Sequence, residues 1–237
     1  MGLTTYQPVG MVVSVIENNA MKLTESRHES KTKLLNAALQ VIREKGYSAT
    51  RIEDVCEAAG LTKGSFFHHF GSKEELAIAA AGYWSEITSA LFASAPYHAP
   101  QDPLARLMAY VDFRKALVHG ELPEFTCLLG TMTQEVYDTH PTIREACNQS
   151  INGHAGTLVS DIEAAMRERG VRDAGTPESL ALFTQAVIQG AFILAKAQHG
   201  AGVAADCIDH LHRYLELLFH QPNQQPESPK GDVRESH

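Results

Sequence analysis

The sequence predicts an all-α fold of about nine helices, and three observations support this prediction. Apolar residues recur every three or four positions along most of the 237-residue chain. Capping residues or prolines open these segments, and glycines often follow their ends. No segment shows the alternation of polar and apolar residues that marks a half-buried strand.

Each expected helix is placed by such start and stop signals. Thr50-x-x-Glu53 and Ser72-x-x-Glu75 are capping boxes, in which a hydroxyl and a carboxylate satisfy free backbone amides at a helix start. A proline at a helix start and a glycine after its end bracket one long segment, 141–169. The expected helices span residues 29–45, 51–59, 63–70, 73–93, 103–118, 123–137, 141–169, 177–198 and 203–219.

The distribution of charge divides the chain into two regions. Residues 22–75 hold nine Lys/Arg and eight Asp/Glu, whereas the whole chain holds 20 Lys/Arg and 28 Asp/Glu. The first region is therefore close to neutral within an acidic protein and is able to meet an anion. The acidic remainder is expected to have a different role.

The cysteine, histidine and hydropathy patterns exclude several classes of protein. Cys56, Cys127, Cys147 and Cys207 lack C-x-x-C spacing, which excludes a zinc ribbon or thioredoxin-type motif and fits a reducing compartment. No histidine pair shares one helix face, so we expect no metal and no cofactor. Apolar runs such as 11–16 are too short to cross a bilayer, and we expect a cytoplasmic protein without a membrane partner.

Residues 50–73 place two short helices across a tight turn, Ala59-Gly60-Leu61. Glycine accepts the positive φ that other residues resist, and Leu61 can fix the angle between the helices. This is the layout of a helix-turn-helix motif, whose second helix enters the major groove of DNA. The alternative is that a short amphipathic helix after such a turn only packs helices together.

The helix that begins at Lys63 carries groups suited to duplex DNA. Phe66 and Phe70 are expected to face inward, which leaves their neighbours outward for thymine-methyl and phosphate contacts. Lys73, at the start of the next helix, is expected to clamp a phosphate together with free backbone amides. The other candidate DNA contacts are two hydroxyls, one lysine, one glycine, one phenylalanine and two histidines: Thr62, Ser65, Lys63, Gly64, Phe67, His68 and His69.

A specific string of residues runs through 34–76: Ala37-Ala38, Gly46-Tyr47, Thr50, Asp54-Val55, Ala58-Ala59-Gly60-Leu61, Thr62-Lys63-Gly64-Ser65, His69-Phe70 and Lys73-x-x-Leu76. With this string the segment resembles the DNA-binding domain of TetR/AcrR-type transcriptional regulators. The resemblance implies three N-terminal DNA-binding helices and about six that bind an effector and dimerise. It adds Thr50 as a DNA contact. Arg51 replaces a usual small hydroxyl and is either a phosphate contact or solvated, and Phe67, where the family commonly has Tyr, is limited to an apolar contact.

The expected domain boundaries follow from these observations. They are a disordered arm at 1–21, a helix-turn-helix DNA-binding domain at 22–75, a ligand-binding and dimerisation domain at 76–220, and a disordered tail at 221–237.

One segment of the second domain, Phe125-Thr126-Cys127-Leu128-Leu129-Gly130 followed by Glu135-Val136, resembles a G-C-L-L-G segment found in a subset of these regulators. Some members of the subset respond to electrophilic or unsaturated small molecules. Here Thr126 stands where a glycine often does. Cys127 is therefore either a reactive thiol near the start of its helix or a small buried hydrophobe.

A ligand pocket is expected among the middle helices, as in other helical bundles. Candidate ligand contacts besides Cys127 combine bulk with a polar tip, although each is also an ordinary core candidate: Tyr83, Trp84, Tyr110, Phe113, Met132, His154, Gln189 and Phe192.

The last two helices are expected to form the homodimer as a four-helix interface, with ordinary intramolecular core as the alternative. One carries a stripe of small residues, Ala181, Ala186, Gly190, Ala191 and Ala195, and the other a broad apolar face, Leu211, Tyr214, Leu215, Leu218 and Phe219.

These features predict a homodimeric, ligand-responsive regulator, most often a repressor in the family, that binds a pseudo-palindromic operator and is released by a small-molecule effector. An activator or corepressor-dependent regulator of the same fold is the alternative. A helical-bundle enzyme or carrier is a distant one, because no G-x-S-x-G motif, phosphate-binding loop or metal-ligand set supports it. We therefore expect no enzymatic activity.

Overall fold

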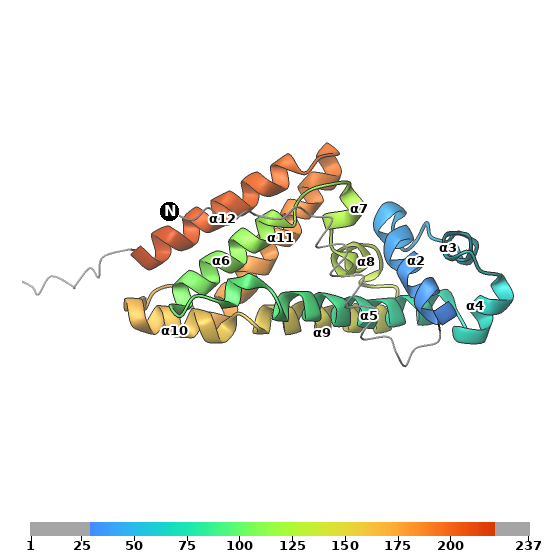
Figure 1. The fold of residues 1–237 in the computed structure, drawn as a ribbon, viewed down its shortest axis with the longest axis horizontal. Coiled ribbons are helices and arrows are strands. Elements are labelled where there is room, and N and C mark those ends of the chain that lie inside the picture. The colour runs from blue at the N-terminus through green and yellow to red at the C-terminus, as the bar shows by residue number, and fades with distance from the viewer. Residues whose placement is uncertain (1–28, 221–237) are drawn as a thin grey trace, which may run out of the picture.

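The computed structural model describes residues 29–220, in which all regular secondary structure is helical (Figure 1). The prediction of an all-α fold is confirmed. The expected arm at 1–21 and tail at 221–237 lie outside the described residues. The elements are α2 (Glu29–Lys45), α3 (Ile52–Ala59), α4 (Lys63–His69), α5 (Lys73–Ala93), a short 3₁₀ turn η1 (Pro96–His98), α6 (Pro103–Ala116), α7 (Leu122–Phe125), α8 (Leu128–Val136), α9 (Pro141–Gly156), α10 (Val159–Arg169), α11 (Pro177–Gln198) and α12 (Gly202–His220).

Two of the expected helices are interrupted. The segment 123–137 is broken at Thr126 and Cys127, which have extended backbone, so Cys127 is the N-cap of α8 and does not lie within a helix. The segment 141–169 is broken at Thr157, whose hydroxyl donates 2.7 Å to the His154 carbonyl. Thr88 in α5 and Thr184 in α11 make similar bonds within unbroken helices, so the hydroxyl alone does not end α9.

The start of α3 also differs from the prediction. Arg51, and not Thr50, is its N-cap, and the Arg51 N–H donates to Asp54 Oδ2 at 2.8 Å. The Thr50 hydroxyl turns inward and donates 2.6 Å to the Gly46 carbonyl at the end of α2. The Asp54 carboxylate, and not the predicted Glu53 carboxylate, therefore caps the start of α3. At α5 the expected hydroxyl cap is present, since Ser72 Oγ accepts from the backbone amide of residue 75.

Buried apolar side chains form two cores. The N-terminal core joins α2–α5 with α8 and α9, and includes Leu34, Phe66 and Met132. The C-terminal core joins α6 and α9–α12, and includes Tyr110 and Ile188. The helix-turn-helix therefore shares its core with α8 and α9, which are distant in sequence.

The arrangement places α3 and α4 at one end of an elongated molecule, with α10 and much of α12 toward the other (Figure 1). α5 and α9 pack side by side along its length. α5 and α11 are long and apolar enough to cross a bilayer, judged by length and composition alone. Both contribute to the cores just described, and the absence of a membrane partner stays a prediction.

Candidate nucleic-acid interface and effector region

The helix α4 is held with one face outward. Gly60 takes a left-handed conformation, with φ of +64°, and turns the chain between α3 and α4. Thr62 caps α4, its hydroxyl accepting from the Ser65 amide at 3.2 Å. Phe66 is fully buried, as expected, whereas the Phe67 side chain is 55% exposed. His68 is exposed as well.

Beside this face lies a recess of about 380 Å³, lined in part by Arg51, Lys63 and Phe67. Both cations are exposed, and each pairs with an acid of α3: Arg51 with Asp54 at 2.8 Å, and Lys63 with Glu53. The hydrogen bond from Arg51 is the main cause that holds the pKa of Asp54 far below its usual range. The Lys63–Glu53 pair is exposed on both sides, and pairs of this kind are weak, so a phosphate can compete for Lys63.

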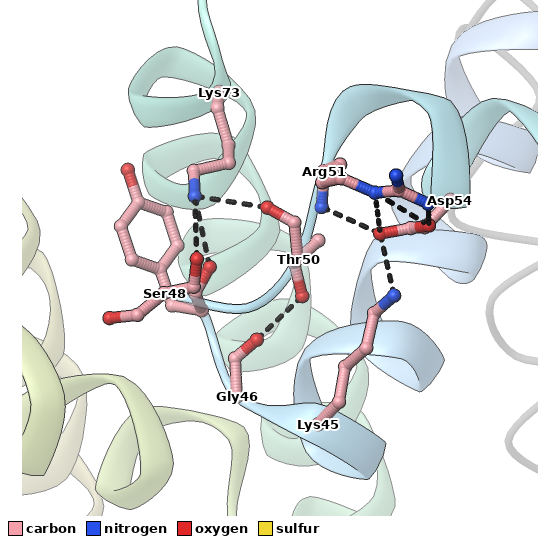
Figure 2. Close-up of polar contacts among 8 residues, drawn as sticks. Lys45, Gly46, Ser48, Thr50, Arg51, Asp54 and Lys73 are labelled. Atoms are coloured by element: carbon pink, nitrogen blue, oxygen red, sulfur yellow. Dashed lines mark hydrogen bonds and ion pairs between the residues drawn. The ribbon is translucent and has the colours of Figure 1, made fainter.

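Lys73 does not point outward as expected. Its ammonium donates to the carbonyls of Tyr47 and Thr50 at 3.0 Å each, and to that of Ser48 at 3.5 Å (Figure 2). It also lies 4.3 Å from the centroid of the Tyr47 ring. Burial lowers the pKa of Lys73, against the opposing effect of the Glu135 charge. The three N–H groups of the ammonium are thus engaged, and Lys73 positions the loop between α2 and α3.

Two more of the predicted contacts face inward. The Thr50 side chain is 2% exposed and its hydroxyl is bound to Gly46, so it is not available to a phosphate. His69 Nε2 lies 2.6 Å from Ser30 Oγ and joins α4 to the first turn of α2. The predicted residues that remain outward or at the edge are Arg51, Thr62, Lys63, Gly64, Ser65, Phe67 and His68.

Glu135 of α8 is a positioning residue that the sequence did not reveal. Its carboxylate accepts from the backbone amides of Tyr47 at 3.2 Å and Ser48 at 2.8 Å. A Cβ added to Gly46, where φ is +85°, would lie 2.2 Å from Glu135 Oε1. The contact joins residues nearly 90 positions apart, and no local pattern announces such a pairing. Lys73 and Glu135 thus hold the α2–α3 loop from two sides.

Cys127 lies at the other end of α8, where its sulfur accepts from the Gly130 amide at 3.5 Å. Lys196 of α11 donates 2.5 Å to Thr131 Oγ1, which itself donates 2.9 Å to the Cys127 carbonyl. Arg43 of α2 also interacts electrostatically with Cys127, and burial lowers the pKa of Arg43 to about 10. The half-buried thiol therefore lies at a helix N-terminus and interacts electrostatically with two cations.

The other candidate ligand contacts divide between the two cores. Tyr83 and Met132 lie in the N-terminal core, and Trp84 packs against it. The Gln189 side chain packs against the backbone of Gly130. A Cβ added to Gly130 would lie 2.3 Å from Gln189 Oε1. Four others come together in the C-terminal core around Arg114, which no sequence pattern marks as a candidate: Tyr110, Phe113, His154 and Phe192.

An apolar surface remains on α11 and α12. Six of the eight large hydrophobic side chains that are exposed among residues 29–220 lie on these helices: Leu182, Phe183, Ile193, Leu194, Tyr214 and Leu217. The surface differs from the one predicted, because six residues of the expected faces are buried within the protomer: Ala181, Ala191, Ala195, Leu211, Leu215 and Phe219. The expected faces are therefore mostly intramolecular core, and the next positions around each helix are exposed.

Two stretches of the chain match known families. Residues 34–80 match bacterial regulatory proteins of the tetR family, and residues 103–211 match the tetracyclin repressor-like C-terminal domain. Together they cover most of the chain, including α4 and the Arg114 neighbourhood. The chain belongs to the TetR family. The resemblance seen in the sequence is thereby confirmed.

Curated relatives of this TetR-family chain are named regulators or repressors. The repressor KstR2 of Rhodococcus jostii is 28% identical over 167 residues, which cover 63% of this chain and 78% of the relative. The repressor NemR of Escherichia coli is 23% identical over 80% of this chain and 96% of its own. The family is one of helix-turn-helix, DNA-binding transcriptional regulators.

Solved structures agree on the fold. A TetR-family regulator from Agrobacterium tumefaciens has a TM-score of 0.69 at 19% identity, covering 78% of this chain and 96% of its own. The reduced form of Escherichia coli NemR has a TM-score of 0.62 at 22% identity. The match covers 77% of this chain and 95% of the NemR chain. At these identities the likeness supports the fold alone.

Proposed function

We propose that this TetR-family protein is a ligand-responsive repressor. It binds a pseudo-palindromic operator as a homodimer, is released by a small molecule, and works in the cytoplasm without enzymatic activity. The observation that carries the proposal is α4, whose outward face presents Lys63, Phe67 and His68 while Phe66 is anchored in the core. Its family relatives are repressors and regulators.

Recovery of genomic DNA fragments by the purified protein tests DNA binding and yields the operator. On that operator, Lys63→Ala is expected to reduce the slope of log affinity against log salt by about 1, because one phosphate contact is lost. The exposed Arg172, far along the chain, supplies the matched control Arg172→Ala, for which the slope stays the same. Recovery of no specific fragment contradicts the proposal.

The exposed apolar surface of α11 and α12 supports the homodimer. A four-helix interface between two copies buries these side chains and sets the spacing of the two α4 helices. Leu217 is the most exposed of them, at 69%, so Leu217→Asp is expected to yield folded monomers in sedimentation and to weaken operator binding at least about 100-fold. Tyr137→Asp, which alters a residue outside α11 and α12 that is 61% exposed, is the control. A Leu217→Asp dimer with normal affinity would contradict this interface.

The setting of Cys127 supports an electrophilic effector. The thiol is partly accessible, caps α8, and lies beside Arg43 and Lys196. Electropositive, partly exposed sites are typical of cysteines that act as nucleophiles. By contrast, Cys147 is buried and burial raises its pKa to about 11, and burial also raises the pKa of Cys56.

N-ethylmaleimide provides the probe for this hypothesis. Sub-stoichiometric reagent is expected to add to Cys127 in intact-mass and peptide analysis and to release the operator. Cys127→Ser removes both effects without changing operator affinity, whereas Cys207→Ser, at the other partly accessible cysteine, leaves both in place. Release that persists in Cys127→Ser excludes this thiol from the mechanism.

The helix α8 offers a route from this thiol to the DNA-binding face. Cys127 caps its first turn, and Glu135 in its last turn holds the loop that leads into α3. A change at the cap that shifts α8 would therefore move the loop, α3 and α4 together. The release requires that the effector favour the shifted state over the DNA-binding state, and not merely that it bind.

A further inference from the structure

The C-terminal core contains a buried cation without an acidic partner. Arg114 of α6 is 9% exposed. Its Nη1 donates to His154 Nε2 at 3.3 Å and to the Tyr110 hydroxyl at 3.5 Å. Among residues 29–220, no carboxylate lies within ion-pair distance of it, and its Nε and Nη2 donate no hydrogen bond to those residues.

The groups around Arg114 are neutral. Gln185 donates 2.8 Å to the Tyr110 hydroxyl, which lies 2.9 Å from His154 Nε2 and can donate to it. Burial, with the Arg114 charge as a second cause, lowers the pKa of His154 to about 3, so its imidazole is uncharged at neutral pH. The cluster of Tyr110, Arg114, His154 and Gln185, which we call the Arg114 cluster, therefore carries one positive charge.

Two aromatic rings lie near the guanidinium. The Phe92 ring lies 5.3 Å from Arg114 Cζ, and the Phe192 ring lies 5.9 Å from it. Phe113 and Tyr97 extend the aromatic wall next to Phe92. A cation in such surroundings is costly to bury unless an anion compensates it.

The other basic residues of α6 each pair with a carboxylate. Arg106 pairs with Asp161 of α10 at 2.5 Å, and Lys115 pairs with Asp209 of α12 at 2.6 Å. Both are more exposed than Arg114. The least accessible cation of the helix is thus the one for which the described chain supplies no carboxylate, which points to a partner from outside.

We infer that the Arg114 cluster anchors an effector with one carboxylate and an apolar, preferably aromatic, body. A guanidinium binds a carboxylate through two parallel hydrogen bonds, and the aromatic wall accommodates the body. A single positive charge matches a monoanion, whereas a phosphate dianion would leave one negative charge buried without a partner. The inference rests on the proposed function in one respect, namely that the bound acid acts on the operator complex.

Calorimetry and thermal unfolding of the full chain test the site with named acids. The probes are butanoate, octanoate, benzoate and 3-phenylpropanoate, each compared with its primary amide. Wild-type protein is expected to bind at least one acid and be stabilised by it, with little response to the matching amide. Arg114→Met weakens that binding by about 30-fold or more.

The same variant separates a ligand site from a structural arginine. If Arg114 serves binding, Arg114→Met leaves the unliganded protein as stable as the wild type or more so, because an apolar replacement removes a buried unpaired charge. Arg106→Met is the matched control, because it breaks an ion pair of the same helix and leaves acid binding unchanged. Equal responses to acid and amide, retained binding in Arg114→Met, or no binding of any of the four acids overturns the inference.

Operator release distinguishes this inference from the proposed function. The binding acid is expected to dissociate the wild-type operator complex and to leave that of Arg114→Met intact, with Cys127→Ser still responding. If the wild-type protein binds no operator, the proposed function is contradicted. Calorimetry of wild type and Arg114→Met with the acids still tests whether the Arg114 cluster binds a carboxylate. If the acid binds the protein but does not dissociate its specific operator complex, the acid is not the effector.

Discussion

The loop between α2 and α3 and the interior of the C-terminal core are held by different kinds of polar contact. Around the loop, side chains bond to backbone: Lys73 to three carbonyls and Glu135 to two amides. In the Arg114 cluster, side chains bond to one another. Ties to the backbone fix where a loop lies, whereas a network of side chains is able to rearrange around a ligand.

The largest expected effect comes from breaking the tie between α8 and the loop. Gly46→Ala places a Cβ on a left-handed backbone and against the Glu135 carboxylate. We expect the free energy of unfolding to fall by about 2–3 kcal/mol, chiefly because alanine is strained at a positive φ, while the exposed Glu135 carboxylate must also move away from the two backbone amides. Chemical denaturation measures this, with operator affinity as the second readout.

Gly153→Ala is the control for this substitution. Gly153 lies in α9, and a Cβ there meets no atom within 4 Å. Alanine favours the helix by up to about 1 kcal/mol, so this variant should be slightly more stable than the wild type. A Gly46→Ala protein as stable as the wild type would mean that Glu135 does not hold the loop rigidly.

An intermediate effect is expected at Lys73. Lys73→Met removes the hydrogen bonds to three carbonyls while keeping much of the side-chain volume, and should cost about 1–3 kcal/mol of stability together with some operator affinity. Because the ammonium is turned to the loop, the salt slope of DNA binding should stay close to that of the wild type, unlike the slope of Lys63→Ala. A slope flattened as much as in Lys63→Ala would show that Lys73 reaches a phosphate.

The smallest effect near neutral pH is expected from His154. Its pKa is about 3 in the folded protein and ordinarily 6.5, so between these values the unfolded chain binds a proton that the folded chain does not. The stability of the wild type therefore falls as pH drops below 6.5, by up to about 1.4 kcal/mol per pH unit from this group. In His154→Gln, denaturation curves at several pH values should lack this contribution. Parallel pH profiles for the two proteins would show that His154 is not kept neutral by burial.

The sequence predicted the helices and the helix-turn-helix because their signals are local. The apolar period, the Thr62 cap and the turn at Gly60 lie within a few residues of what they determine. The breaks at Cys127 and Thr157 are not visible in the sequence because an interruption of two residues hardly disturbs the apolar period. The domain boundaries stay a prediction.

The candidate site was predictable only in part. The outward residues of α4 follow from the inward pair Phe66 and Phe70. The inward turn of Lys73, the role of Glu135 and the contact of Arg114 with His154 depend on residues 23 to 88 positions apart. A basic residue looks the same in a sequence whether it faces a duplex, a loop or a buried ligand.

The tie made by Glu135 has a consequence for how this corner of the protein evolves. Among residues 29–220, the Glu135 carboxylate accepts hydrogen bonds only from the main-chain N–H groups of residues 47 and 48. The side chains of Ser48 and Ala49 point to solvent. Residues 48 and 49 should therefore vary widely among orthologues. The glycine at position 46 and the carboxylate at position 135 should covary.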